Sequence, residues 1–119
     1  LCFLEIGKEY LADFIIEMKK LYKYVTFYNS TYYNNSKNLC YIVQGSEKRL
    51  NLKLDGMDEE KIIEFICKNL QYECIGDLCM GRGLVGFNSY LNNKNFVGIE
   101  LNHKRLSVLL ENISKRKYS

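Results

Sequence analysis

The stretch Tyr72–Asn112, YECIGDLCMGRGLVGFNSYLNNKNFVGIELNHKRLSVLLEN, decides how this 119-residue chain is interpreted. Glu73–Leu78 is a short apolar run bounded by a glycine, which is typical of a buried strand rather than a helix. Gly81 and Gly83 then allow a turn with positive φ and let a ligand approach the backbone without meeting a Cβ atom. The pattern predicts a strand followed by a tight turn that a ligand can reach.

Beyond the turn, the same stretch predicts a helix, a second strand and a second helix. Leu84–Leu91 can begin a helix whose free N–H groups face the turn, and Asn92 and Asn93 end it. We expect the second strand at Asn95–Leu101, with Glu100 at its C-terminal end. A carboxylate in that position accepts hydrogen bonds from the two hydroxyls of a ribose. The arrangement indicates a site for a nucleoside-containing cofactor.

Two classes of cofactor fit this arrangement. Residues 81–86, GRGLVG, match the G-x-G-x-x-G turn of dinucleotide sites, and Glu100 follows at a suitable distance. Asp77–Gly83, DLCMGRG, resembles motif I of S-adenosylmethionine-dependent methyltransferases, D-x-[FC]-x-G-x-G. Nicotinamide-binding folds usually carry an apolar residue at the acidic position. Asn95–Asn102, NFVGIELN, is similar to a phrase of DNA methyltransferases that act on the amino groups of adenine or cytosine, with His103 in place of the family's proline.

The resemblance to these methyltransferases implies S-adenosylmethionine as the cofactor. In the family, the strand-end aspartate and the glycine backbone surround the methionine part of the cofactor. Transferred to the matching positions, this implies cofactor contacts from the following residues: Asp77, Cys79, Met80, Gly81, Gly83, Glu100 and Leu101. The family's helix before motif I opens with Lys-Pro, whereas this chain has Gly56-Met-Asp58 there, which is a departure from the pattern.

The chain contains no proline, and this bears directly on catalysis. Amino-methyltransferases carry a second motif, Asp/Asn/Ser-Pro-Pro-aromatic, whose polar group holds the target amine while the ring stacks on the flipped base. This sequence has no such motif, and it also lacks Ser-His-Asp, H-E-x-x-H and P-loop groupings. We therefore assign no catalytic residue and no metal ligand.

The order of the elements explains how the catalytic motif can be missing. In one arrangement of the family the catalytic motif precedes motif I, so this chain resembles the C-terminal, cofactor-binding part of such an enzyme. The chain begins with Leu rather than Met, which indicates a fragment or a processed chain. By resemblance, Glu73–Leu78 is the first strand of the family's sheet and Cys2–Ile6 is the fifth. We expect the intervening fourth strand to come from upstream residues or from a partner chain.

The first half of the chain predicts the other elements of an α/β domain. They are, in order, a strand at Cys2–Ile6, a helix at Glu9–Tyr22, a hairpin of Tyr24–Tyr28 with Leu39–Val43, an extended connector or short strand at Lys48–Leu54, and a helix from an Asp58 N-cap to about Leu70. The expected fold class is α/β, a Rossmann-like methyltransferase sheet with an antiparallel hairpin, incomplete in this chain. Within this single partial domain, residues 1–54 form a strand–helix–hairpin half and residues 55–119 a cofactor-binding half.

The polar loop at residues 29–38, NSTYYNNSKN, places two adjacent tyrosines at the tip of the hairpin. Tyrosine rings stack on unpaired bases, so Tyr32 and Tyr33 are candidates for contact with a substrate or partner. The alternative is that they reflect strand propensity on a half-buried face. Glu5, at a strand end, has two interpretations of the same kind, a place near the site or a solvated or capping role.

Composition limits the remaining possibilities. The net charge of +3 permits binding to a polyanion without requiring it. The five cysteines have no C-x-x-C spacing, and Cys2, Cys40, Cys67 and Cys74 lie in apolar patterns, so we expect buried, reduced thiols and a cytoplasmic protein. One histidine gives a metal site little to use, and no segment has the length of a membrane span.

These observations predict the cofactor-binding part of an enzyme that transfers a methyl group from S-adenosylmethionine to an exocyclic amino group of a base in DNA. RNA or protein substrates stay open from the sequence. Two alternatives are a non-catalytic cofactor-binding or regulatory subunit and a fragment of a nicotinamide-dependent oxidoreductase.

Overall fold

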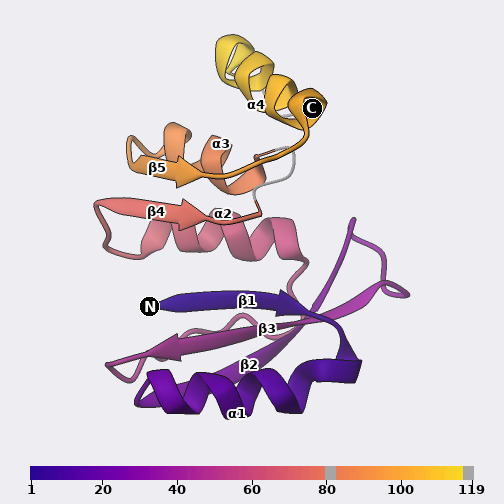
Figure 1. Ribbon diagram of the computed structural model, residues 1–119, viewed down its shortest axis with the longest axis vertical. Coiled ribbons are helices and arrows are strands. Elements are labelled where there is room, and N and C mark those ends of the chain that lie inside the picture. The colour runs from indigo at the N-terminus through magenta and orange to yellow at the C-terminus, as the bar shows by residue number, and fades with distance from the viewer. Residues whose placement is uncertain (80–82, 117–119) are drawn as a thin grey trace. The chain divides into compact units, whose positions relative to one another are not determined.

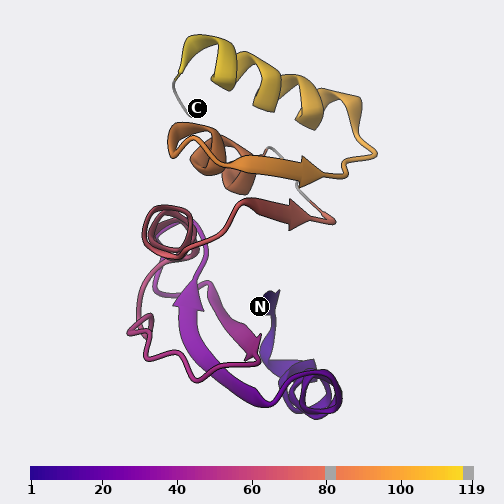
Figure 2. The ribbon, with the colours of Figure 1, turned by 90° about the vertical axis from the view of Figure 1, so that its left-hand side faces the viewer.

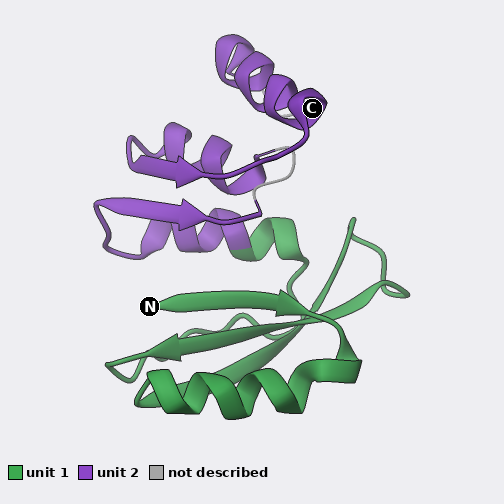
Figure 3. Ribbon diagram, viewed as in Figure 1, with its two compact units in different colours: residues 1–62 green, residues 63–119 purple. Residues whose placement is uncertain are grey.

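The computed structural model describes residues 1–79 and 83–116 of the chain (Figure 1). They form two compact units, Leu1–Ile62 and Ile63–Ser119, which are described separately (Figure 3). The class is α/β and the antiparallel hairpin is present, as the sequence predicts. Within the described residues, no helix is long and apolar enough to cross a membrane.

The first unit contains a three-stranded sheet with β3 in its centre. Its elements are β1 (Cys2–Ile6), η1 (Lys8–Tyr10), α1 (Leu11–Leu21), β2 (Tyr24–Thr31), β3 (Leu39–Ser46) and the start of α2 (Glu59–Asn69). The strand order is β1-β3-β2, and both pairs are antiparallel. β1 and β2 therefore run in the same direction, α1 connects them, and β3 is inserted between them.

A glycine on β3 lets α1 approach the sheet closely. A Cβ atom at Gly45 would lie 2.6 Å from the Cε atom of Met18 and 2.6 Å from Cδ2 of Tyr22. Met18 is buried on α1, and Val43, two residues before Gly45 on the same side of β3, is fully buried. The connector between β3 and α2 lies on the other side of the sheet (Figure 2), where its Leu54 is fully buried.

The connector also covers the open edge of β2. The backbone N–H of Asn29 donates to Asp55 Oδ1 at 2.9 Å, and the N–H of Gly56 donates back to the carbonyl of Asn29 at 2.9 Å. Ser30 Oγ donates to the carbonyl of Met57 at 2.8 Å. An edge strand covered in this way is protected from pairing with another chain.

These contacts explain why the hairpin strands are longer than the sequence predicts. β2 continues to Thr31 and β3 to Ser46, although the last residues of both are polar. Their polar groups are bonded to the connector or to each other, so they can be buried. The predicted N-terminal strand is confirmed at Cys2–Ile6, and the predicted first helix begins with a 3₁₀ turn at Lys8–Tyr10.

The second unit is built around two parallel strands. Its elements after α2 are β4 (Cys74–Asp77), α3 (Leu84–Leu91), β5 (Asn95–Gly98) and α4 (His103–Lys115). Cys74 pairs with Asn95 and Asp77 pairs with Gly98. Phe87 of α3 and Leu109 of α4 form a buried cluster on which three partly buried side chains pack: Phe96, Leu106 and Ile113.

Gly86 lies where α3 packs on β5. A Cβ atom at this position would come 2.7 Å from Cε1 of Phe96, so only glycine allows the close packing. Gly86 therefore serves the packing of α3 on β5. Among the described residues, β4 pairs only with β5, so this sheet has two strands.

Two predictions for this unit need correction. β5 ends at Gly98 rather than Leu101, because β4 ends at Asp77, whose carbonyl makes the last backbone bond between the two strands, to the N–H of Ile99. Cys74 is exposed rather than buried, since it begins a two-stranded sheet whose start has little cover, whereas Cys40 and Cys67 are buried.

Candidate functional site

The carboxyl ends of β4 and β5 lie side by side because the two strands are parallel and in register up to Asp77 and Gly98. In open α/β sheets, ligands bind outside this end of the strands. The Asp77 carboxylate folds back on its own turn, where Oδ1 accepts from the backbone N–H of Cys79 at 3.1 Å. The Asp77 carbonyl accepts from the N–H of Ile99 at 3.0 Å, which joins the two strand ends.

Gly83 provides the turn that leads into α3. It has φ 85° and ψ 34°, in the left-handed region where side chains are disfavoured. A Cβ atom here would also lie 2.6 Å from Cδ1 of Leu109. The prediction that Gly83 needs to be glycine is confirmed. Met80 and Gly81, also predicted to contact the cofactor, lie outside the described residues.

Glu100 lies two residues beyond β5, partly buried, at the start of the segment that leads into α4. Its Oε2 accepts from the backbone N–H of Asn102 at 2.9 Å. Among the described residues nothing donates to Oε1, so this oxygen keeps its acceptor capacity for a ligand. Leu101, 91% exposed, follows it with an apolar side chain that no described neighbour covers.

Asn102 holds this acidic segment in place, and the sequence reasoning missed it. Its Oδ1 accepts from the N–H groups of Lys104 at 3.0 Å and Arg105 at 3.3 Å, which caps α4. The same residue donates its own N–H to Glu100, so the capping geometry also orients the carboxylate. An Asn directly before an amphipathic helix is the signal that could have identified it.

The structure therefore places the described members of the predicted cofactor set in one unit. Asp77, Cys79 and Gly83 border the turn after β4, and Glu100 and Leu101 border the turn after β5. These groups offer carboxylate oxygens and backbone N–H groups, which hold and orient a ligand. Among the described residues, no cluster of three His, Cys, Asp or Glu side chains could hold a metal ion.

Tyr32 and Tyr33 belong to the other unit, at the carboxyl end of β2. Tyr33 is 79% exposed and has φ 55°, which is unusual for a large side chain. Its ring lies 6.4 Å from the ring of Tyr32, tilted by 41°. Asp58 holds the loop that carries the two tyrosines. Its Oδ1 accepts from Thr31 Oγ1 at 2.8 Å and from the N–H of Asn34 at 2.7 Å.

Asp58 thus does more than the N-cap role predicted from the sequence. Its second oxygen accepts from the N–H of Glu60 at 3.3 Å in the first turn of α2, so the cap is present. The long-range bonds to the hairpin were missed, because nothing in the sequence brings residues 31 and 58 together. They tie the tip of the hairpin to the start of α2.

A pair of glutamates lies near Tyr32 in the same unit. Burial, followed by the neighbouring Glu5, raises the pKa of Glu59 to about 8, so Glu59 holds its proton at neutral pH. Burial, followed by Glu5, raises the pKa of Tyr32 to about 12. Glu5 is therefore one member of a carboxyl pair and not an isolated strand-end acid.

Comparison with known proteins gives a likeness in structure alone. No family model matches the chain, and no curated protein matches it by sequence. The crystal structure of M1.HpyAVI is similar, with a TM-score of 0.71 and 12% identity over 94% of this chain and 71% of that one. The crystal structure of the M1.HpyAVI-SAM complex gives a TM-score of 0.66 and 12% identity over 92% of this chain and 72% of that one. At this identity the likeness shows the fold alone, an α/β fold shared with M1.HpyAVI, in agreement with the α/β class expected from the sequence.

Proposed function

We propose that this chain binds S-adenosylmethionine at the carboxyl ends of β4 and β5. The observation that carries the proposal is Gly83 in its left-handed turn, between Asp77 of β4 and the first turn of α3. This geometry occurs in a fold shared with M1.HpyAVI, a protein whose SAM complex has been solved. The motif resemblance of residues 77–83 and the shared fold are independent lines of support for the same cofactor.

Each described residue of the site has a proposed role. Asp77 and the backbone of Cys79 and Gly83, with Met80 and Gly81, surround the methionine part of the cofactor. Glu100 accepts hydrogen bonds from the ribose hydroxyls, using the oxygen that Asn102 leaves free. Leu101 offers its exposed apolar side chain to the adenine ring beside that ribose.

We further propose that the complete protein methylates an exocyclic amino group of a base in DNA. The bound cofactor supplies an electrophilic methyl group. The residues of this chain orient it, so the reaction depends on positioning the methyl group in line with the amine. The polar-Pro-Pro-aromatic motif that holds the amine comes from upstream residues or from a partner chain, since the sequence holds no proline. Tyr32 and Tyr33 are the proposed contacts to the nucleic acid, and we expect the protein to act in the cytoplasm.

The absence of that motif also favours a second candidate, a cofactor-binding subunit that regulates a catalytic partner. Both candidates use the same cofactor site. They differ in whether methyl transfer to DNA occurs when the catalytic segment is supplied. Asp77, by contrast, disfavours a nicotinamide cofactor, because its carboxylate stands where such folds usually have an apolar residue.

Calorimetric titration with S-adenosylmethionine tests the proposal. Glu100→Ala should weaken binding by about 1.5–3 kcal/mol, the scale of hydrogen bonds to a charged group. Glu111→Ala is the matched control, since Glu111 is an exposed acid of the same unit whose partner is Lys115. Unchanged affinity in the Glu100 variant would remove Glu100 from the site, and tighter binding of NAD than of S-adenosylmethionine would favour the dinucleotide alternative.

A further inference from the structure

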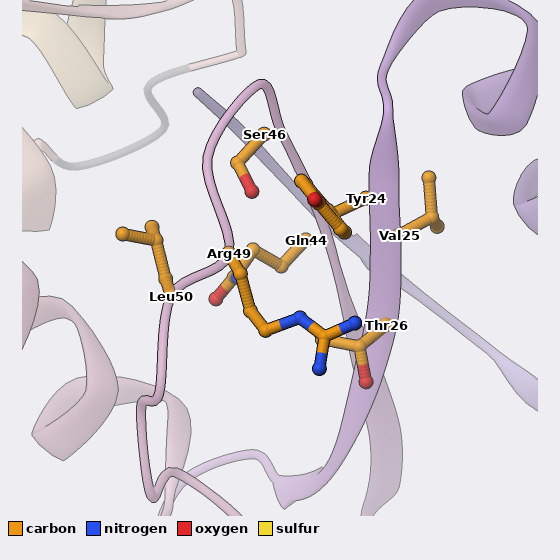
Figure 4. Close-up of a pocket in the computed structure, with 7 residues that line it drawn as sticks. All are labelled: Tyr24, Val25, Thr26, Gln44, Ser46, Arg49 and Leu50. Atoms are coloured by element: carbon orange, nitrogen blue, oxygen red, sulfur yellow. The ribbon is translucent and has the colours of Figure 1, made fainter.

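A second site lies in the first unit, at the amino ends of β1 and β2. A pocket of about 210 Å³ opens between the start of β2, the end of β3 and the connector (Figure 4). Tyr24 pairs with Ser46 here, whereas Thr31 pairs with Leu39 at the other end of the hairpin. The pocket is therefore at the end of the sheet opposite to Tyr32 and Tyr33.

Two cations converge on one aromatic ring at this pocket. The guanidinium of Arg49 lies 5.4 Å from the centroid of the Tyr24 ring, and Lys23 Nζ lies 5.6 Å from it. Figure 4 shows Arg49 extending from the connector toward Thr26 on β2. Among the described residues, neither cation forms an ion pair with a carboxylate. A cation without a counter-charge attracts an anion, and here Arg49 lines the pocket while Lys23 lies against the same tyrosine ring.

A buried amide provides an uncharged donor in the same pocket. Gln44 is only 2% exposed, and the hydroxyl of Tyr28 donates to its Oε1 at 2.8 Å. This bond directs the two N–H donors of Nε2 away from Tyr28, and no described residue accepts from them. Gln44 lines the pocket, so these N–H groups can donate to a ligand atom that enters it.

The acid nearest in sequence does not provide this acceptor. Glu47 is exposed, and its charge affects Tyr22. The pKa of Tyr22 is raised by Cys2 first, then by burial, and least by Glu47. Tyr22 lies over Gly45, on the α1 side of the sheet. Gln44, one residue away along β3, faces the opposite side, because successive side chains of a strand alternate.

We propose that Lys23, Arg49 and Gln44 form a binding site for a phosphate group. Guanidinium, ammonium and amide N–H groups are all donors, and an oxyanion with several acceptor oxygens matches them. The phosphate belongs either to a nucleic-acid backbone or to a free phosphorylated compound. The site is independent of the cofactor site and adds to the proposed function an anion contact at the amino ends of β1 and β2.

Titrations of the chain with inorganic phosphate and with a short DNA duplex test this site. Phosphate is followed by backbone amide chemical shifts and the duplex by fluorescence anisotropy. The double variant Lys23→Gln/Arg49→Gln should raise the Kd for phosphate at least about tenfold. If the duplex uses the site, the slope of log K for duplex binding against log salt concentration should decrease by about one phosphate contact. Both residues are exposed, so the variant should fold normally.

The control variant is Lys20→Gln/Lys115→Gln, which changes the net charge equally but removes cations that already pair with Glu17 and Glu111. It should bind both probes like the parent chain. Gln44→Glu keeps the acceptor for Tyr28 but replaces the N–H donors with an oxygen. Its affinity for phosphate should also fall.

The outcomes separate the two sources of phosphate. If the Lys23/Arg49 variant binds both probes more weakly, the ligand is a phosphate of a nucleic-acid backbone. If it binds only inorganic phosphate more weakly, the ligand is a free phosphorylated compound. Equal binding of both probes by the parent and this variant overturns the proposal, as does an equal loss in the control variant. Affinity for S-adenosylmethionine should not change in any of these variants, so a failure here is distinct from a failure of the cofactor site.

Discussion

The two sheets of this protein differ in how they are completed. In the first unit, β3 has partners on both sides, and the connector covers the free edge of β2 through Asp55, Gly56 and Met57. In the second unit, β4 and β5 pair only with each other among the described residues, and large apolar side chains near their ends are exposed: Leu78 78%, Val97 63%, Ile99 53% and Leu101 91%. The first sheet has its β2 edge covered by its own chain, and we call it the closed sheet; we call the two-stranded sheet of the second unit the open sheet.

The difference shows what each sheet has to do. The closed sheet is held by side-chain hydrogen bonds between residues far apart in sequence, such as Asp58 with Thr31. The open sheet carries its polar groups at the carboxyl ends of parallel strands, where a ligand can be accommodated. Mutations should therefore affect ligand binding most in the second unit and stability most in the first.

The largest expected effect is on the turn of the open sheet. Gly83→Val should abolish binding of S-adenosylmethionine, because valine disfavours φ 85° and its side chain would meet Leu109. Calorimetry measures the binding, and circular dichroism should show that most of the helical signal remains. Gly7→Val is the control, since a Cβ at Gly7 meets nothing within 4 Å. Normal binding by the Gly83 variant would mean that the motif match is accidental.

The next effect is on the hydrogen bonds of Asp58 that link the hairpin to α2 in the closed sheet's unit, which we call the Asp58 clamp. Asp58→Ala removes the acceptor for Thr31 Oγ1 and for the N–H groups of Asn34 and Glu60. We expect it to lower the free energy of unfolding by about 2–4 kcal/mol, because hydrogen bonds to a buried charged group are the strong ones. Urea denaturation measures this.

The comparison for that clamp is Asp55→Ala. Asp55 is exposed and accepts from the backbone of Asn29, so its loss should cost less than about 1 kcal/mol. Equal losses in the two variants would show that Asp58 is not the main link between the hairpin and α2.

A third prediction concerns pH in the closed sheet. An acid whose pKa rises from 4.5 to about 8 on folding binds its proton more tightly in the folded state. The stabilisation from Glu59 is therefore complete below about pH 4.5 and is lost as the pH rises through about 8. Glu59→Gln keeps the side chain neutral, so the Tm at pH 9 should be higher than that of the parent chain.

Thermal melts at pH 5 and pH 9 measure this difference. Glu60→Gln, an exposed glutamate in the same turn of α2, serves as the control and should follow the parent chain. A Glu59 variant with the same pH dependence as the parent would show that the proton is not held at this carboxyl pair.

The smallest effect is expected at the tip of the hairpin. Tyr33→Gly relieves a left-handed conformation at φ 55° and loses little packing, so the free energy of unfolding should rise by up to about 1 kcal/mol. Asn34→Gly, at φ 52°, should gain less because asparagine tolerates this region. If the Tyr33 variant is more stable but binds DNA more weakly, the ring serves binding. Unchanged DNA binding would remove Tyr33 from the proposed contacts.

Local patterns predicted the second unit better than the first. The helix at Leu84–Leu91 is found at the predicted residues, because Gly83 begins it and Asn92 and Asn93 end it through local geometry. The end of β5 was wrong, since strand length depends on a partner, and β4 ends at Asp77. The role of Glu100 stays a prediction, although its position beyond the strand and its bond to Asn102 are now known.

The first unit depends on contacts that no local pattern contains. The burial of Gln44 and Ser46 could not be predicted from residue type. Both can be buried because Gln44 accepts a hydrogen bond from Tyr28 and Ser46 donates one to the connector, and only the fold brings these partners together. The same is true of the Lys23–Tyr24–Arg49 arrangement, which joins residues on either side of the hairpin. Sequence indicated a hairpin here, and only the three-dimensional pairing shows the pocket beside it.

The insertion of β3 between β1 and β2 has a consequence for the order of folding during synthesis. β1 is made first, but its only partner among the described strands is β3, which follows after α1 and β2. At about 5–20 residues per second, β1 waits roughly 2–8 s on the ribosome before β3 emerges. The β2–β3 hairpin can then close within roughly 1–10 μs. The hairpin is thus expected to form first and to act as the template onto which the waiting N-terminal strand is added.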